Sequence, residues 1–369
     1  MVTESSNTTA NEFYFTAVRP YILETIPSNE ESELRGKDYI RWGENDEYGN
    51  FLFKCYSECP ILQSVINGTV DYVCGDDITL NVPNLAFEVN REGESFRDVI
   101  TKALIDYYIF GNGYIQVVKN KGGKIAELYW LDARFVRSGL KNQVFYYNED
   151  FGKKWGKSKK TVVYPAYMPE GVDAASILML KTPNSRGTYG TPIWEAAVKP
   201  VMTEMGIDTF HLAEIQNNFA GSAVINFNNG TPTPEQKGEL EKNVQEKLGG
   251  PENAGRIILS FNKGKDNATT VERLQSDDFD SRYNDLAKKT QLQIFTVFGA
   301  NANLFGVPTE SNGFNAEEYQ SSFKLYNRTR VKPVQRYISG RMDRLFQMND
   351  SVTIIPFSIE ENTKEQTVE

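Results

Sequence analysis

Apolar positions at helical spacing mark two helices between residues 276 and 347. The first predicted helix begins after Ser276 and ends at Gly299, since glycine is a common residue just past a helix end. Its apolar face comprises Phe279, Tyr283, Leu286, Thr290, Ile294 and Val297. A loop with Gly306, Pro308 and Gly313 follows. Asn315 then caps a second helix, whose faces are Tyr319, Phe323 and Tyr326 and, beyond a predicted end or kink at Pro333, Val334, Ile338, Met342 and Leu345.

The N-terminal half alternates between helical and strand patterns. Ser95 is a suitable cap for a helix that continues to Phe110, where Gly111 ends it. An NKGG turn at residues 120–123 between two alternating segments predicts a β-hairpin. Further elements are predicted as a helix over 59–72 and strands over 78–82, 144–147, 161–165, 177–180 and 352–357, with 28–50 as surface loop.

A long helix is predicted for residues 192–219, with Thr191 as its cap and Pro192 at its first position. At 1.5 Å per residue it would measure about 40 Å, and Pro200 and Gly206 are candidate kinks. Residues 222–274 then read as strand, charged helix, strand and a possible further strand. This module has too few apolar positions for a core of its own, which favours assembly with neighbours.

The composition is that of a globular protein, with 40% hydrophobic and 24% charged residues among 369. The formal net charge of −9 argues against tight nonspecific DNA binding over the whole surface. No apolar run is long enough to cross a bilayer, and the N-terminus lacks the pattern of a secretory signal.

Residues that carry catalytic or metal chemistry are scarce. Cys55, Cys59 and Cys74 suit a reducing compartment and a buried structural role, and the single histidine, His211, is far from them in sequence. There is no Walker loop and no G-x-S-x-G elbow, and no spacing of carboxylates singles out a nuclease pair. We therefore expect no catalytic residue, no metal site and no cofactor. A phage- or prophage-encoded DNA-processing enzyme and a monomeric adaptor remain as alternatives.

Four stretches in a fixed order resemble one family. They are FGNGYIQVVKNKGGKIAELYWLDARFVR, YGTPIWEAA, NNFAGSAVINF, and LFGVP followed by a polar loop and a helix with EEY and RVKPV. Together, over about residues 55–350, they resemble the portal proteins of long-tailed double-stranded DNA phages that share the common capsid fold.

The resemblance implies an α+β fold with named parts. These are an α/β wing (1–190), a first stem helix (191–221), a small αβ clip (222–275), a second stem helix (276–300), a tunnel loop (301–315), and a wing or crown helix with a C-terminal strand (316–369). It also implies a dodecamer at one capsid vertex of the virion, assembled in the host cytoplasm. Its partners would be double-stranded DNA, the major capsid protein, the large terminase subunit and a head–tail adaptor, without a membrane.

The site residues follow from these parts. The tunnel loop would place neutral polar groups and one charge against passing DNA, through Asn301, Asn303, Glu310, Ser311, Asn312 and Asn315. Basic residues of the second stem helix, Arg282, Lys288 and Lys289, are candidates for the channel wall. Clip lysines Lys237, Lys242, Lys263 and Lys265 would meet partner proteins. The alternative for the loop is burial between subunits, away from DNA.

Overall fold

The computed structural model describes residues 26–33, 39–43, 45–151, 160–183, 187–216, 223–227, 233, 257–261, 279–307 and 316–357. The chain divides into two compact units. One comprises Met1–Thr25 and Gly206–Asp285, and the other comprises Ile26–Met205 and Leu286–Glu369. The division falls within the helices α4 (Val198–Gln216) and α6 (Phe279–Phe298).

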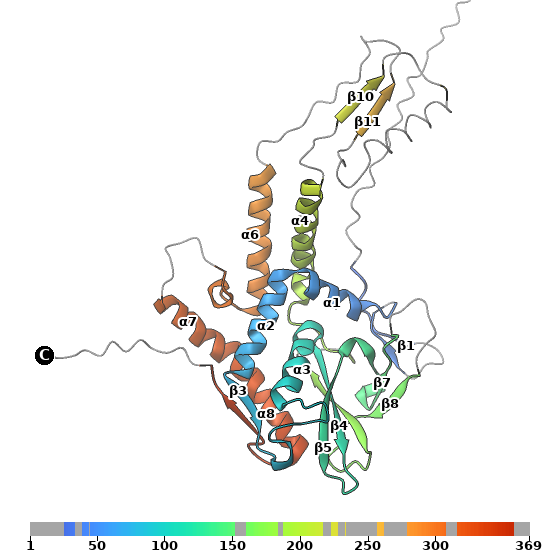
Figure 1. The fold of residues 1–369 in the computed structure, drawn as a ribbon, viewed down its shortest axis with the longest axis vertical. Coiled ribbons are helices and arrows are strands. Elements are labelled where there is room, and N and C mark those ends of the chain that lie inside the picture. The colour runs from blue at the N-terminus through green and yellow to red at the C-terminus, as the bar shows by residue number, and fades with distance from the viewer. Residues whose placement is uncertain are drawn as a thin grey trace, which may run out of the picture. The chain divides into compact units, whose positions relative to one another are not determined.

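The larger unit is built on short antiparallel sheets and packed helices (Figure 1). Its helices are α1 (Tyr48–Glu58), α2 (Pro60–Cys74), α3 (Phe96–Phe110), α7 (Ala316–Tyr326) and α8 (Lys332–Phe346), with parts of α4 and α6. Its strands are β1 (Ser32–Glu33), β2 (Ile40–Arg41), β3 (Asp77–Leu80), β4 (Asn112–Lys119), β5 (Ile125–Leu131), β6 (Val136–Ser138), β7 (Val144–Tyr147), β8 (Val162–Pro165), β9 (Ala175–Lys181) and β12 (Val352–Ile355). The mixture of helix and sheet confirms the predicted α+β class.

The central sheet has the order β5-β4-β9, with β4 antiparallel to both neighbours. A second sheet, β6-β7-β8, is joined to it by a bridge between Ala166 and Ile177. Helix α3 packs against β4, and the predicted hairpin of β4 and β5 is confirmed. Gly113 on β4 permits this close contact, because a Cβ there would lie 2.2 Å from the carbonyl oxygen of Ala103 on α3.

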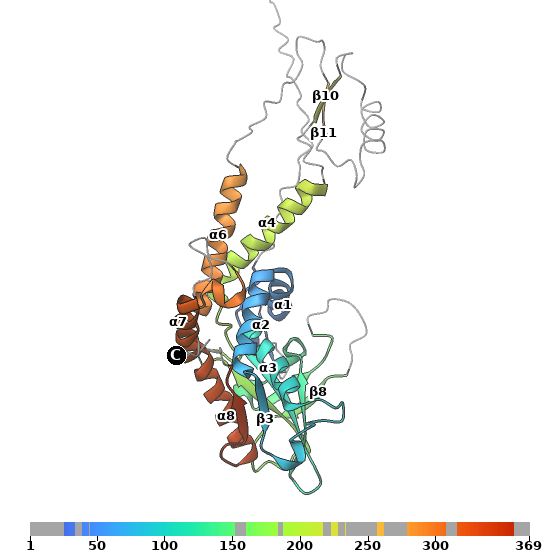
Figure 2. The same cartoon turned by 60° about the vertical axis from the view of Figure 1, so that its left-hand side comes forward.

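The C-terminal strand β12 pairs with β3 from the N-terminal half, with Val352 opposite Leu80. Both strands were predicted, but their pairing joins segments more than 270 residues apart and lies beyond any local pattern. Helix α8 buries Ile338, Met342 and Leu345, as its spacing predicts. In Figure 2, α8 and β3 lie on the same flank of the larger unit.

The predicted surface loop at 28–50 is wrong for its second half. Trp42 is 2% exposed and stacks on Tyr189 with ring centroids 5.0 Å apart. The Arg137 guanidinium donates from Nε to Asp46 Oδ1 over 2.6 Å, and both residues are buried. Two charged side chains can be buried in the core when they pair with each other, and the polar composition of residues 28–50 does not indicate such a pair.

The predicted start of the long helix is also wrong. Thr191 does not cap it, because α4 begins only seven residues later, and the Thr191 backbone N–H donates instead to Thr182 Oγ1 over 3.1 Å. Trp194 is buried and donates from Nε1 to the carbonyl of Tyr108 over 3.1 Å. This packing against the end of α3 holds the chain in a turn, so that α4 begins only at Val198.

The C-terminal helix continues through Pro333, but its hydrogen bonding just before the proline is not that of a regular α-helix. A π-helical turn, Asn327–Val331, lies between α7 and α8, and the N–H of Lys332 bonds to the carbonyl of Asn327. The proline lacks an N–H for the carbonyl four residues back, and the wider turn accommodates this loss.

In the smaller unit the structure describes parallel strands β10 (Ala223–Phe227) and β11 (Ile257–Phe261). Both coincide with predicted strands of the clip. A parallel pair needs a crossover connection, which is consistent with the helix predicted between them. That helix, residues 234–248, and the strand predicted over 269–274 lie outside the described residues.

Candidate functional site

The two predicted stem helices meet within the larger unit through a buried carboxylate. Thr290 Oγ1 on α6 donates to Glu204 Oε2 on α4 over 2.6 Å, and Gln291 Nε2 lies 3.5 Å from Oε1. Glu204 is 7% exposed. Burying a carboxylate is costly without hydrogen-bond donors, so these contacts fix how α4 and α6 pack at this level.

Helix α6 ends at Gly299 with a positive φ of 61°. A Cβ at Gly299 would lie 2.6 Å from Arg330 Nε, so the guanidinium sits directly against the end of the helix. A cation at a helix C-terminus is favoured by the helix dipole. The contact ties the end of α6 to the π-turn of the C-terminal helix.

The first part of the predicted tunnel loop is a packed turn. Residues Ala302–Phe305 form a short 3-10 helix, and Asn301 caps it by accepting from the N–H of Asn303 over 3.3 Å. Asn301 Nδ2 also donates to Ser322 Oγ on α7 over 3.1 Å. Asn301 thus holds the turn against α7, whether or not it also meets DNA.

Aromatic side chains anchor the same turn to α2. The Tyr72 hydroxyl donates to the carbonyl of Leu304 over 2.8 Å, and Phe305 packs edge-on against the Tyr72 ring. Burial raises the pKa of Tyr72, so its hydroxyl stays protonated and available as a donor. Gly68 leaves room for Phe305, because a Cβ there would lie 2.8 Å from the ring. A shallow open cavity of about 410 Å³ beside Tyr72 and Phe305 is lined by Ser64, Asn67, Gly68, Asp71, Leu304 and Phe357.

The structure places only part of the predicted site. Asn301 and Asn303 are half-buried, and Lys288 and Lys289 on α6 are exposed. Arg282 is on α6, but its side chain lies outside the described part of the chain. Outside it as well are the tunnel-loop residues Glu310, Ser311, Asn312 and Asn315 and the clip lysines Lys237, Lys242, Lys263 and Lys265. Their roles stay predictions.

Carboxylates with shifted pKa values hold the fold together. Asp106 Oδ2 accepts from Trp130 Nε1 over 2.9 Å and from the N–H of Ala133 over 3.0 Å. Its burial, together with the charge of Asp132, raises its pKa well above the usual value. The carboxylate fixes the end of β5 and is not accessible to a substrate.

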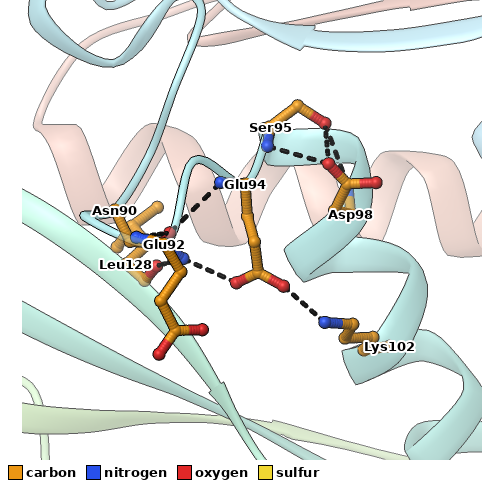
Figure 3. Close-up of polar contacts among 7 residues, drawn as sticks. All are labelled: Asn90, Glu92, Glu94, Ser95, Asp98, Lys102 and Leu128. Carbon is orange, nitrogen blue, oxygen red and sulfur yellow. Dashed lines mark hydrogen bonds and ion pairs between the residues drawn. The ribbon is translucent and has the colours of Figure 1, made fainter.

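A second polar cluster, at the start of α3, likewise stabilises the fold (Figure 3). The Ser95 hydroxyl and backbone both pair with Asp98, and these hydrogen bonds lower the pKa of Asp98. Burial would raise the pKa of Glu94, but hydrogen bonds from Lys102 and Asn90 outweigh it and hold the pKa below its usual value. The cluster closes the turn before α3 and caps that helix.

The described part of the chain lacks a metal-binding cluster and a membrane-spanning helix. No group of three or more His, Cys, Asp or Glu side chains there is placed to hold a metal ion. Cys55, Cys59 and Cys74 are buried thiols outside any disulfide, which confirms their predicted place in the core. No described helix is both long and apolar enough to cross a membrane.

Comparison with known proteins gives both a sequence and a fold relationship. The sequence model of the family described as phage portal protein matches residues 88–364, about three quarters of the chain. No curated protein sequence matches the chain.

Three solved structures share the fold at low identity. A chain in the neck of an empty gene transfer agent (GTA) particle, computed with C6 symmetry, has a TM-score of 0.55 and 16% identity, covering 89% of this chain and 86% of that one. A chain in the virion of the native GTA particle has a TM-score of 0.53 and 17% identity over the same shares.

The third is a chain in the neck of the native GTA particle, computed with C12 symmetry. It has a TM-score of 0.52 and 15% identity, covering 84% of this chain and 85% of that one. These likenesses show a shared fold, and the family model matches most of the chain. The chain belongs to the phage portal protein family.

Proposed function

We propose that this chain forms a dodecameric ring at one vertex of a capsid, through which double-stranded DNA is packaged and ejected. The observation that carries the proposal is the family match over residues 88–364. The C12 symmetry with which a particle neck of the same fold was computed supports twelve copies.

Exposed apolar side chains support assembly independently. In the single chain Leu292 on α6 is 67% exposed and Leu325 on α7 is 65% exposed. Scattered exposed leucines are ordinary on a monomer, but here one lies on α6, the predicted second stem helix, and the other on α7, which follows the predicted tunnel loop. A neighbouring copy in a ring would cover Leu292 on α6.

The partners follow from the position of a portal. Double-stranded DNA would pass through the channel without sequence specificity. The clip, residues 222–275, would face outward and meet the large terminase subunit and a head–tail adaptor through Lys237, Lys242, Lys263 and Lys265. The major capsid protein would surround the ring, which would assemble in the host cytoplasm and remain in the virion.

Within the channel we assign DNA contact to the later part of the tunnel loop, with Glu310, Ser311, Asn312 and Asn315. Asn301 and Asn303 belong to the packed turn and would act mainly by holding the loop's base in place. Neutral side chains make weak phosphate contacts, which suits a conduit that must let its cargo slide. Arg282, Lys288 and Lys289 would moderate repulsion at the channel wall.

The portal family is one of structural channel proteins, and we propose no enzymatic activity for this chain. A DNA-processing enzyme would need an accessible set of reactive groups. Asp106, a carboxylate whose pKa is raised by burial, is enclosed and already accepts two hydrogen bonds.

The proposal is tested by packaging in proheads assembled with the wild-type chain or with Ser311→Lys and Asn312→Lys together. Added cations should retain DNA more strongly and slow its translocation, with retention that weakens as salt rises. Glu92→Lys, an exposed change in the larger unit, is the control. Intact variant rings with unchanged translocation and retention would refute the loop assignment, and wild-type proheads that never incorporate the chain would refute the function.

A further inference from the structure

The C-terminal helix of the larger unit carries a run of positive charge without any acidic residue. Between residues 319 and 342 the sequence has six cations and no Asp or Glu, namely Lys324, Arg328, Arg330, Lys332, Arg336 and Arg341. The chain as a whole has a net charge of −9. The net charge of this segment thus has the opposite sign to that of the whole chain.

Two of the six cations are used by the fold. Arg330 lies against the end of α6 at Gly299, and Arg341 donates from Nη2 to the carbonyl of Met179 over 3.0 Å. The other four, Lys324, Arg328, Lys332 and Arg336, are exposed. None of these four forms an ion pair with a carboxylate among the described residues.

The four free cations recur every fourth residue, and the π-turn helps to keep them aligned. In a regular α-helix a step of four residues drifts by about 40° around the axis. The π-turn at Asn327–Val331 has more residues per turn, so it rotates less per residue and offsets part of this drift. The buried residues Phe323, Tyr326, Val331 and Ile338 occupy the other side. We call the exposed side, defined by Lys324, Arg328, Lys332 and Arg336, the basic face.

We propose that the basic face binds the phosphate backbone of duplex DNA without sequence specificity. This rests on the proposed function, which brings DNA to the ring, and adds a contact surface separate from the tunnel loop and from Arg282, Lys288 and Lys289. The row extends about 18 Å at 1.5 Å per residue. One strand carries about five phosphates over that length of duplex axis.

The composition of the basic face favours DNA over a protein partner. Protein interfaces are enriched in arginine, but they are depleted of lysine and have apolar or aromatic centres. On the described residues 316–346, Leu325 is the only large apolar side chain that is strongly exposed. A row of exposed cations with one leucine instead matches the regular charge of a polyanion.

The test measures how DNA affinity depends on salt. The full-length protein in its native oligomeric state is titrated with a fluorescent duplex of random sequence between about 50 and about 200 mM salt. The variant carries Lys324→Gln, Arg328→Gln, Lys332→Gln and Arg336→Gln. If all four cations contact phosphates, the slope of log affinity against log salt should flatten by about 3.6.

The matched control removes four positive charges elsewhere in the same unit, through Lys121→Gln, Lys124→Gln, Lys141→Gln and Lys199→Gln. All four lysines are exposed. The control should keep the wild-type slope. A double variant, Lys324→Gln with Lys332→Gln, should lose about half of the effect and serves if the quadruple variant proves unstable.

Three results would overturn the proposal. The slope of the quadruple variant could be unchanged, or both variants could lose equal slope, which would indicate only net charge. Alternatively, native mass measurements could show that the quadruple variant alone loses its rings, which would make the basic face a contact between copies. A wild-type chain that never forms rings would refute the proposed function instead, while the salt slope would still report on this surface.

Discussion

Helices α3 and α6 bury their surfaces to very different extents. Ten of the fifteen residues of α3 are buried, including the carboxylate of Asp106. On the described side chains of α6, Thr290, Ile294, Phe295 and Phe298 are buried, whereas Leu286 and Leu292 are 38% and 67% exposed. The single chain therefore buries most of α3 by itself but leaves apolar side chains of α6 exposed. In the proposed ring a neighbouring copy would bury these side chains.

This difference gives a rule for substitutions. Changes around α3 should alter the free energy of unfolding of the single chain. Changes on the exposed side of α6 should leave that free energy nearly constant and alter assembly. The predictions below are ordered by their expected effect on the unfolding free energy of the single chain.

The largest effect is expected for Arg137→Ala. The substitution leaves Asp46 as a buried carboxylate that keeps only the backbone N–H of Trp42, at 2.9 Å, among its described hydrogen-bond donors. Breaking a buried ion pair by removing one partner costs about 3–5 kcal/mol. Urea unfolding followed by tryptophan fluorescence measures the loss. Lys121→Ala, at an exposed turn, is the control, and an equal loss in both variants would contradict the assigned role of the pair.

Gly113→Ala should be the next most damaging. Its Cβ would overlap the carbonyl oxygen of Ala103, so α3 and β4 would have to separate. Overpacking of this kind costs about 1–3 kcal/mol. Gly340→Ala in α8, where the added Cβ meets nothing within 4 Å, should instead stabilise the chain by about 0.5–1 kcal/mol. Stabilisation by both changes would show that backbone entropy, and not the contact with Ala103, sets the result.

Ser95→Ala removes the cap of α3 and should cost about 0.5–2 kcal/mol at neutral pH. Ser95 holds the pKa of Asp98 below its usual value, so the charged carboxylate stabilises the folded state above that usual pKa. This stabilisation is lost as the pH falls through the lowered pKa. The difference between wild type and variant should therefore shrink in acid. Ser64→Ala, at an exposed position of α2, should show neither the loss nor its pH dependence.

Leu292→Gln should have the smallest effect on folding, within about 0.5 kcal/mol. In the proposed ring it would nevertheless reduce assembly, because a polar amide replaces an apolar contact with the next copy. Thermal unfolding and native mass measured on the same preparations separate the two effects. Val172→Thr, at a residue that is 98% exposed in the larger unit, is the control. A large fall in the stability of the dissociated chain would place Leu292 in the core instead.

Local patterns predicted the parts of the fold that depend on neighbouring residues. The cap at Ser95, the stop at Gly111 and the β4–β5 hairpin are set within a few positions, and the structure confirms them. The start of α4 and the burial of Trp42 depend on contacts between distant segments. The periodicity around Thr191 therefore did not indicate the hydrogen bonds to Thr182 and Tyr108 that hold this segment.

The candidate site shows the same division. The sequence identified a turn with Asn301, but not that its amide caps that turn and bonds to Ser322. The cations at 324, 328, 332 and 336 are visible in the sequence as a charge-rich segment. Their common exposed side depends on the π-turn before Pro333, which the spacing of apolar residues did not predict.

Native mass spectrometry of the purified full-length chain, paired with negative-stain images, tests the proposed ring most directly. We predict a closed ring of twelve copies, with a mass twelve times the 41.8 kDa of the chain. Co-expression with the scaffolding and capsid proteins covers the possibility that assembly needs them. A monodisperse monomer under all of these conditions would contradict the ring, and with it the proposed cover for the exposed side of α6.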